Sequence, residues 1–246
     1  MMRSYLTILV IVIFTSCNDE GAPGCFKTTG DILEYNIELE EFTSIDVRNN
    51  FNVTIEQGSV QRVKLTSGAN LRGNISLEVM GDELIIQENS KCDWVRDYGN
   101  FNVHIVTPQL SQIRSSGGGV ISSKGTLQFN NRLVLISELF TADFRLDVDL
   151  PGLVITNNDL SNYLITGEVS KLNVGFYAGD GRFDGSDLVA ETVVVFQRGT
   201  NDMIVNATQS LTGEIRSTGN VIYCQEPPIL DVQVIDDRGS LINSCN

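Results

Sequence analysis

The sequence predicts an all-β protein, a single-stranded parallel β-helix built from stacked turns of chain. Short runs of alternating apolar and polar residues recur along it, and no helical apolar period of about 3.6 residues is sustained. Apolar anchors also return at intervals of roughly 20 residues, a spacing typical of the stacked turns of a β-helix. These anchors are Leu110, Leu133, Leu153, Leu172, Val193 and Leu211. A β-sandwich is the alternative fold, because it also shows frequent turn signals.

The N-terminal segment is interpreted as a signal peptide that lies outside this fold. Its apolar run from Tyr5 to Phe14 is about half the ~20 residues that a transmembrane helix needs. The run ends in Thr15-Ser16-Cys17, which resembles the lipobox of bacterial lipoproteins. We therefore expect residues 1–16 to be removed and Cys17 to be lipidated. The alternative is an ordinary secretory signal followed by an unrelated cysteine.

Residues 17–30 are expected to form a lipidated N-terminus and a short polar tether. Residues 18–24 include two acids and contain no hydrophobic anchor. Acids directly after a lipid-bearing cysteine also resemble the export signals of some Gram-negative lipoproteins. The expected location is therefore the outer membrane, with the protein exposed at the cell surface and held there by its lipid.

Strands and corners alternate through the rest of the chain. The runs at residues 51–55, 75–79 and 101–106 each alternate apolar with polar residues and are bounded by Gly, Asn or Pro. The corners at 113–121 and 176–183 lead through Gly, Ser or Asp into another apolar pair. Tight corners need positive φ or close backbone approach, which glycine supplies at the lowest cost.

Residues 31–246 are predicted to form a single β-helix domain, because both halves follow the same pattern. Phe42-Thr43-Ser44-Ile45 echoes Leu110-Ser111-Gln112-Ile113, and Asn49-Asn50-Phe51 echoes Gly117-Gly118-Gly119. One turn of this size cannot bury its inward face alone, whereas stacked turns about 4.8 Å apart close a continuous core.

Charge restricts the class of partner. The formal net charge is −14, from 31 acids and 17 bases. Attraction to phosphate backbones or anionic lipid is therefore disfavoured, and nucleic acid is excluded as a partner.

The cysteines predict two disulfides rather than a metal site. With Cys17 assigned to lipid, four cysteines remain, none in metal-binding spacing, and an exported chain meets an oxidising environment. Cys224 and Cys245 are separated by about one turn, so we expect them to stack on adjacent turns and pair. Cys25 then pairs with Cys92 by elimination.

Several segments carry a family resemblance. The runs 42–47 and 51–55, Gly73-Asn74-Ile75, and 110–117 resemble the head GIN domain of auto-transporter adhesins, over about residues 40–224. The resemblance implies a pectin-lyase-like β-helix, export as a lipoprotein and a role in cell adhesion. It implies no catalytic residue, and nothing in the sequence indicates a cofactor. The chain departs from the family's Gly-x-Gly corner in several turns, for example at Asn157-Asn158-Asp159 and Thr141-Ala142-Asp143.

Two sets of residues are candidates for a catalytic or a metal site. His104, the only histidine, lies between apolar residues and is expected to point outward from a strand without a catalytic role. Asp180, Asp184 and Asp187 could share a calcium ion, but their spacing fits no known calcium loop. We therefore expect no metal site there, and solvated corners instead.

Residues 89–100 break the strand pattern and contain the only tryptophan. Trp94, Arg96 and Tyr98 lie close together in the sequence and could form a ligand-binding, sugar-stacking platform. The alternative is that Trp94 packs onto the core beside Cys92.

The sequence thus predicts a non-catalytic surface lipoprotein that presents β-helix faces to a glycan or an extracellular protein. A polysaccharide lyase or hydrolase on the same scaffold is the alternative function. An enzyme of that kind needs converging acids, whereas the acids here are scattered over the corners. A purely structural envelope protein is the third hypothesis.

Overall fold

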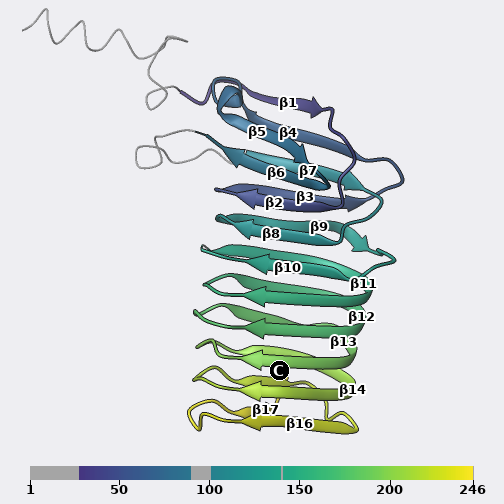
Figure 1. Ribbon diagram of the computed structural model, residues 1–246, viewed down its shortest axis with the longest axis vertical. Helices are drawn as coiled ribbons and strands as arrows, with labels where there is room; N and C mark the ends of the chain where they lie inside the picture. The colour runs from purple at the N-terminus through teal and green to yellow at the C-terminus, as the bar shows by residue number, and fades with distance from the viewer. Residues whose placement is uncertain (1–27, 90–100, 140, 246) are drawn as a thin grey trace, which may run out of the picture.

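The computed structural model describes residues 28–89, 101–139 and 141–245 as an elongated β-solenoid whose turns stack along one axis (Figure 1). Strands of successive turns pair in parallel, which confirms the predicted parallel β-helix and excludes the β-sandwich. The only helical element in these ranges is the single 3-10 turn η2 (Arg72–Asn74). No helix among the described residues is long and apolar enough to cross a lipid bilayer.

The strands lie in two rows that enclose the core. Row A contains, in spatial order, β5 (Ile75–Met80), β6 (Glu83–Glu88), β2 (Ser44–Arg48), β8 (Gln112–Ser116), β10 (Leu133–Ser137), the second halves of β11 (Ala142–Asn157), β12 (Asn162–Phe176), β13 (Arg182–Gln197) and β14 (Met203–Ile215), and β16 (Ile229–Val234). Row B contains β1 (Ile32–Ile37), β4 (Arg62–Gly68), β7 (Phe101–Thr107), β3 (Phe51–Gln57), β9 (Gly119–Leu127), the first halves of β11–β14, β15 (Val221–Tyr223) and β17 (Leu241–Asn243). Strands β11–β14 join the rows because each bends from row B into row A.

The apolar anchors form an inward stack in row A. The aligned members on β10 to β14 are Leu133, Leu153, Leu172, Val193 and Leu211. Each is at most 1% exposed. Burial of such a side chain contributes about 1.5–3 kcal/mol, so this stack is a main source of stability. The sixth anchor, Leu110, is buried but precedes β8 and is out of this register, aligned instead with Phe42.

Glycine is required where successive corners approach each other closely. Gly179, Gly199, Gly219 and Gly239 recur at one corner, and Gly179 has a φ of +88°. A Cβ atom on Gly219 would lie 2.4 Å from the carbonyl oxygen of Asn201. The amide of Gly219 instead donates a hydrogen bond to the carbonyl of Gly199, at 3.1 Å. The predicted structural role of these corners is therefore confirmed.

Buried polar side chains replace glycine at the corner around Asn157. The amide Nδ2 of Asn157 donates to the carbonyl of Asp159 at 3.1 Å, and the hydroxyls of Ser137 and Ser161 are 2.6 Å apart. Ser161 also accepts a hydrogen bond from the amide of Ala142 on the preceding turn. Because every member finds a partner, the corner tolerates burial without glycine.

The N-terminal turns depart from simple sequential stacking. The turn formed by β2 and β3 lies between two later turns (Figure 1). The turn of β6 and β7 stacks on its N-terminal side, and the turn of β8 and β9 stacks on its C-terminal side. Strands β1, β4 and β5 pair antiparallel with their neighbours at this end. The repeat pattern did not predict this exchange of order.

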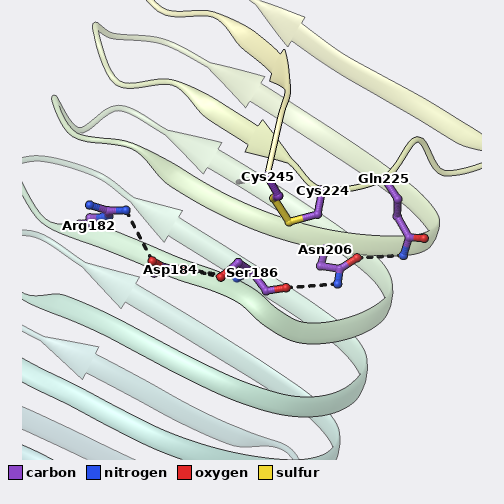
Figure 2. Close-up of a disulfide and its surroundings, with 7 residues drawn as sticks. All are labelled: Arg182, Asp184, Ser186, Asn206, Cys224, Gln225 and Cys245. Carbon is purple, nitrogen blue, oxygen red and sulfur yellow. Dashed lines mark hydrogen bonds and ion pairs between the residues drawn. A yellow bond between two sulfur atoms is a disulfide. The ribbon is translucent and has the colours of Figure 1, made fainter.

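The C-terminal end is held by the predicted disulfide between Cys224 and Cys245. The two cysteines follow β15 and β17, which pair in parallel on adjacent turns, and their Cα atoms are 4.6 Å apart (Figure 2). This bridge confirms the turn register inferred from the sequence. Cys17, Cys25 and Cys92 lie outside the described residues.

Candidate functional site

The outward face of row A carries an apolar strip. Strands β10 to β14 bury one set of side chains in the core, and the alternate set points outward. We call "the strip" the outward residues Val134, Ile136, Val154, Asn173, Val194 and Phe196, together with Tyr177 at the end of β12. Val154 aligns with Val134 on the turn before it and with Asn173 on the turn after it. Asn173 in turn aligns with Val194, so the strip crosses adjacent turns.

An aromatic pair lies at the corner-side margin of the strip. The ring of Tyr177 covers Gly175, where a Cβ atom would lie 2.8 Å from the tyrosine Cε2. Its centroid is 5.0 Å from that of Phe196, which aligns with Gly175 on the next turn. Tyr177 remains 45% exposed, as does Val194 at 48%. Gly175 therefore gives the tyrosine ring a place on the sheet surface.

Cations surround the strip. Arg132 and Lys171 lie along its bend-side margin, on either side of Gly152. On the corner side, Arg198 lies one turn beyond Tyr177, and Arg216 lies one turn beyond Arg198. Arg216 is paired with Glu214, whereas Arg132, Lys171 and Arg198 have no ion-pair partner among the described residues. The strip thus has a net basic margin on a chain whose formal net charge is −14.

The neighbouring edge of the solenoid is acidic. Asp149 and Glu168 align on adjacent turns where the chain bends from row B to row A, and Glu191 follows at the next bend. Asp149 accepts a hydrogen bond from Gln128 at 3.0 Å. Charge is therefore separated over a short distance, with bases on the row A face and acids at the bend.

Between β11 and β13, row B has a polar outward face with a shallow depression of about 290 Å³. Its charged residues neutralise one another, since Arg145 lies 3.2 Å from Asp143 and Arg182 lies 3.5 Å from Asp184. Leu164, 48% exposed, is the apolar residue between them. This surface lacks both the aromatic pair and the unpaired cations that distinguish row A.

His104 points outward from β7, as the alternation predicts. Its Nε2 lies 2.9 Å from the carboxylate of Glu56 on β3, and Lys124 on β9 lies 3.1 Å from the same carboxylate. The hydrogen bond from Lys124 and, to a smaller extent, the one from His104 lower the pKa of Glu56. These contacts join three adjacent turns and give His104 a structural environment.

Two of the three aspartates considered for calcium, Asp180 and Asp184, have separate partners. Asp180 accepts a hydrogen bond from Thr200 at 2.6 Å, and Asp184 accepts one from Ser186 at 2.8 Å and pairs with Arg182 (Figure 2). Over the described residues, no group of three or more His, Cys, Asp or Glu side chains, Asp187 included, is placed to hold a metal ion. The predicted platform residues Trp94, Arg96 and Tyr98 lie outside the described part of the chain.

The strip itself was missed by the sequence reading, although a signal for it exists. The runs Leu133-Val134-Leu135-Ile136 and Val193-Val194-Val195-Phe196 are apolar at every position instead of alternating. A strand with apolar residues of both parities presents apolar side chains on both faces. One face of each run is the core, so the other must be an apolar surface.

Comparison with solved structures supports the fold. The chain is similar to a putative adhesin from Bacteroides fragilis NCTC 9343, with a TM-score of 0.79, 19% identity and coverage of 87% of this chain and 97% of that chain. A putative lipid binding protein from Parabacteroides distasonis ATCC 8503 gives 0.62, 16% identity and coverage of 87% and 98%. A putative adhesin from the same organism gives 0.60, 17% identity and the same coverage. At these identities the likeness establishes the fold alone.

Comparison with protein families goes further. None of the curated proteins matches the chain. A family model described as "Putative auto-transporter adhesin, head GIN domain" matches residues 41–227, most of the described solenoid. The resemblance seen in the sequence is thereby confirmed, and the chain belongs to this head GIN domain family.

Proposed function

We propose that this protein is a non-catalytic adhesin that binds an external glycan or protein through the strip. The observation that carries the proposal is the aromatic pair on the outer face of row A, in which the exposed Tyr177 packs against the half-buried Phe196. Exposed contiguous apolar surface is typical of binding sites rather than of inert faces of a soluble protein. The family's description as adhesins agrees with such a role.

The contacts of the acids near the strip favour binding over catalysis. A lyase or hydrolase needs carboxylates that converge on one bond, one of them with a raised pKa. Glu138 and Glu214, two acids beside the strip, are instead held in ion pairs with Arg114 and Arg216. Neither carboxylate is free to act as an acid or base on a bound sugar.

The membrane anchor is proposed to be a lipid on Cys17, which holds the solenoid at the outer membrane with its faces outside the cell. We expect Cys17→Ala to keep the fold and to move the protein from the membrane fraction to the soluble exported fraction, because one residue carries the acyl chains. Fractionation of cells followed by immunoblotting measures this. Unchanged membrane association of the variant would refute the lipid anchor.

Adhesion is tested with beads that carry the full chain, incubated with epithelial cells and with immobilised extracellular matrix. We expect the double variant Tyr177→Ser with Phe196→Ser to lose most of the bound beads, and Leu164→Ser on row B to retain them. Thermal unfolding checks that both variants are folded. Equal retention by the strip variant and the row B variant would show that the strip is not the adhesive surface.

A further inference from the structure

We infer that the strip recognises an anionic glycan, one that carries carboxylate or sulfate groups. This inference rests on the proposed adhesive function and names the class of its ligand. The observation behind it is a contrast of charge: the face that exposes the aromatic pair also carries unpaired cations, although the chain as a whole is strongly acidic. A ligand that matches both features has an apolar face and a negative charge.

The aromatic pair suits the apolar face of a sugar ring. One side of a pyranose presents mainly C–H groups, which pack on an aromatic ring that lies flat and accessible. Tyr177 is 45% exposed and is supported from the side by Phe196. Because Gly175 lies beneath the tyrosine, the ring is held against the sheet instead of extending freely into solvent. Less side-chain entropy is then lost when a ligand binds.

A polar side chain lies within the strip where sugar hydroxyls would need partners. Asn173 is exposed and aligns between Val154 and Val194 on neighbouring turns. Its amide can donate and accept hydrogen bonds at once. Within the described chain no side-chain hydrogen bond of Asn173 is present, so the amide is available to a ligand.

The cations lie at both margins of the strip. Lys171 precedes Asn173 by two residues on β12, and Tyr177 and Arg198 lie at the opposite margin. A ligand that crosses the strip along the strands therefore meets cations about 20 Å apart, the length of roughly six strand residues. Guanidinium and ammonium groups bind carboxylate and sulfate by charge-assisted hydrogen bonds.

Shape and charge favour a glycan over an anionic bilayer. A bilayer is wide and flat, so contact with the strip would also bring it toward Glu168 and Glu191 at the adjacent bend. Glu191 directly precedes Thr192, which aligns with Lys171, so the acids lie beside this margin and repel an extended anionic surface. A narrow oligosaccharide can remain on the basic and apolar residues.

The test compares one oligosaccharide with and without its charge. The full chain is titrated by calorimetry with oligogalacturonate and with the same oligomer after methyl esterification of its carboxyl groups, and chondroitin sulfate tests sulfate in parallel. We expect oligogalacturonate or chondroitin sulfate to bind, esterification to weaken binding about tenfold or more, and added salt to weaken binding of the charged forms alone.

Two variants separate stacking from charge. Tyr177→Ala is expected to lower affinity for the charged and esterified oligomers alike, and Arg198→Gln to lower affinity for the charged forms only. Leu164→Ala and Arg145→Gln on row B are the matched controls and should bind as the parent does. Arg198 is exposed and has no ion-pair partner in the described chain, so its substitution leaves the fold intact.

The outcomes distinguish this inference from the proposed function. Equal affinity for charged and esterified oligomers, or no effect of Arg198→Gln, would overturn the anionic glycan. The full chain could instead bind phosphatidylglycerol vesicles or a matrix protein through the strip and bind neither glycan. That result would overturn the anionic glycan in favour of the other ligand and leave the adhesive function standing. Strip variants that adhere to cells as the parent does would overturn both.

Discussion

The two halves of the solenoid are built differently from similar strands. Between β10 and β14 each turn lies on the one before it in sequence, and outward residues fall into continuous stacks. Between β1 and β9 the turns exchange order, and three strand pairs are antiparallel. At the row A positions that align with Val134, this half carries Gln112, Ser44 and Glu83. The strip therefore begins where sequential stacking begins.

The in-register stacking of turns between β10 and β14 is what produces the strip. Parallel in-register stacking places chemically similar side chains above one another, so repeats that conserve the core can also build a continuous binding face. The irregular half serves another purpose, because antiparallel strands close the N-terminal end of the core. There Tyr35 and Ile37 of β1 pack against core residues, and Arg72 lies over the tyrosine ring.

The largest contrast is expected in the core. Phe176, fully buried between turns, contacts the ring of Tyr163, whereas Tyr35 is only partly buried in β1. We expect Phe176→Ala to lower the free energy of unfolding by about 3–5 kcal/mol because it leaves a cavity. Tyr35→Ala should cost about 1–2 kcal/mol, including the loss of the Arg72 contact. Chemical denaturation measures both values, and equal losses would contradict the difference between the halves.

The disulfide should matter most to the last turns. Replacing Cys224 and Cys245 together by Ala is expected to lower the free energy of unfolding by about 3 kcal/mol, since the bridge closes a loop of one turn. Hydrogen exchange should become faster in β16 and β17 and stay unchanged in β1 and β4. Uniform acceleration over the whole chain would show that the bridge does not act locally. Non-reducing peptide mapping of the parent also tests the proposed Cys25–Cys92 pair.

Glycine at a crowded corner and glycine at the N-terminal end provide the next comparison. Gly219→Ala introduces a Cβ atom 2.4 Å from a backbone oxygen of the preceding turn. We expect a loss of about 1–3 kcal/mol in the free energy of unfolding. Gly73→Ala, with no atom within 4 Å of the new Cβ, is the matched control and should be neutral or slightly stabilising. A neutral Gly219→Ala would show that the corner spacing is wrong.

The smallest effect concerns pH in the irregular half. The lowered pKa of Glu56 means that its contribution to stability is present above the ordinary glutamate pKa of about 4.3 and is lost as pH falls through the lower folded value. Lys124→Ala removes the largest cause and should raise the Glu56 pKa toward the ordinary value. NMR titration of the carboxyl carbon measures the shift. An unchanged pKa in the variant would assign the effect elsewhere.

The fold could be predicted from sequence where repetition is regular. The anchors from Leu133 to Leu211 and the Cys224–Cys245 spacing fixed the turn length, because aligned turns must match in length to stack. The exchange of turns could not be read from spacing, although a clue was present. Residues 51–53 and 101–103 share Phe-Asn-Val, and β3 pairs with β7 along this segment.

The candidate site was less predictable, because composition averages over the surface. A net charge of −14 suggested that anionic ligands are disfavoured, yet Arg132, Lys171 and Arg198 gather on one face. Their sequence separations are unremarkable, and only the turn register brings them around the strip. Tyr177 is similar, since the sequence places it in a corner and gives no sign that Gly175 opens a place for its ring.

The most direct test covers one face of the solenoid with a chemical label and leaves the other face unchanged. A bulky maleimide is attached to the full chain at Asn173→Cys, in the centre of the strip, or at Leu164→Cys, on row B, and bead adhesion to cells is measured before and after labelling. The account predicts that labelling at residue 173 abolishes adhesion and labelling at residue 164 leaves it unchanged. Adhesion that survives the label at 173, or is lost equally with both labels, would contradict the strip as the binding surface.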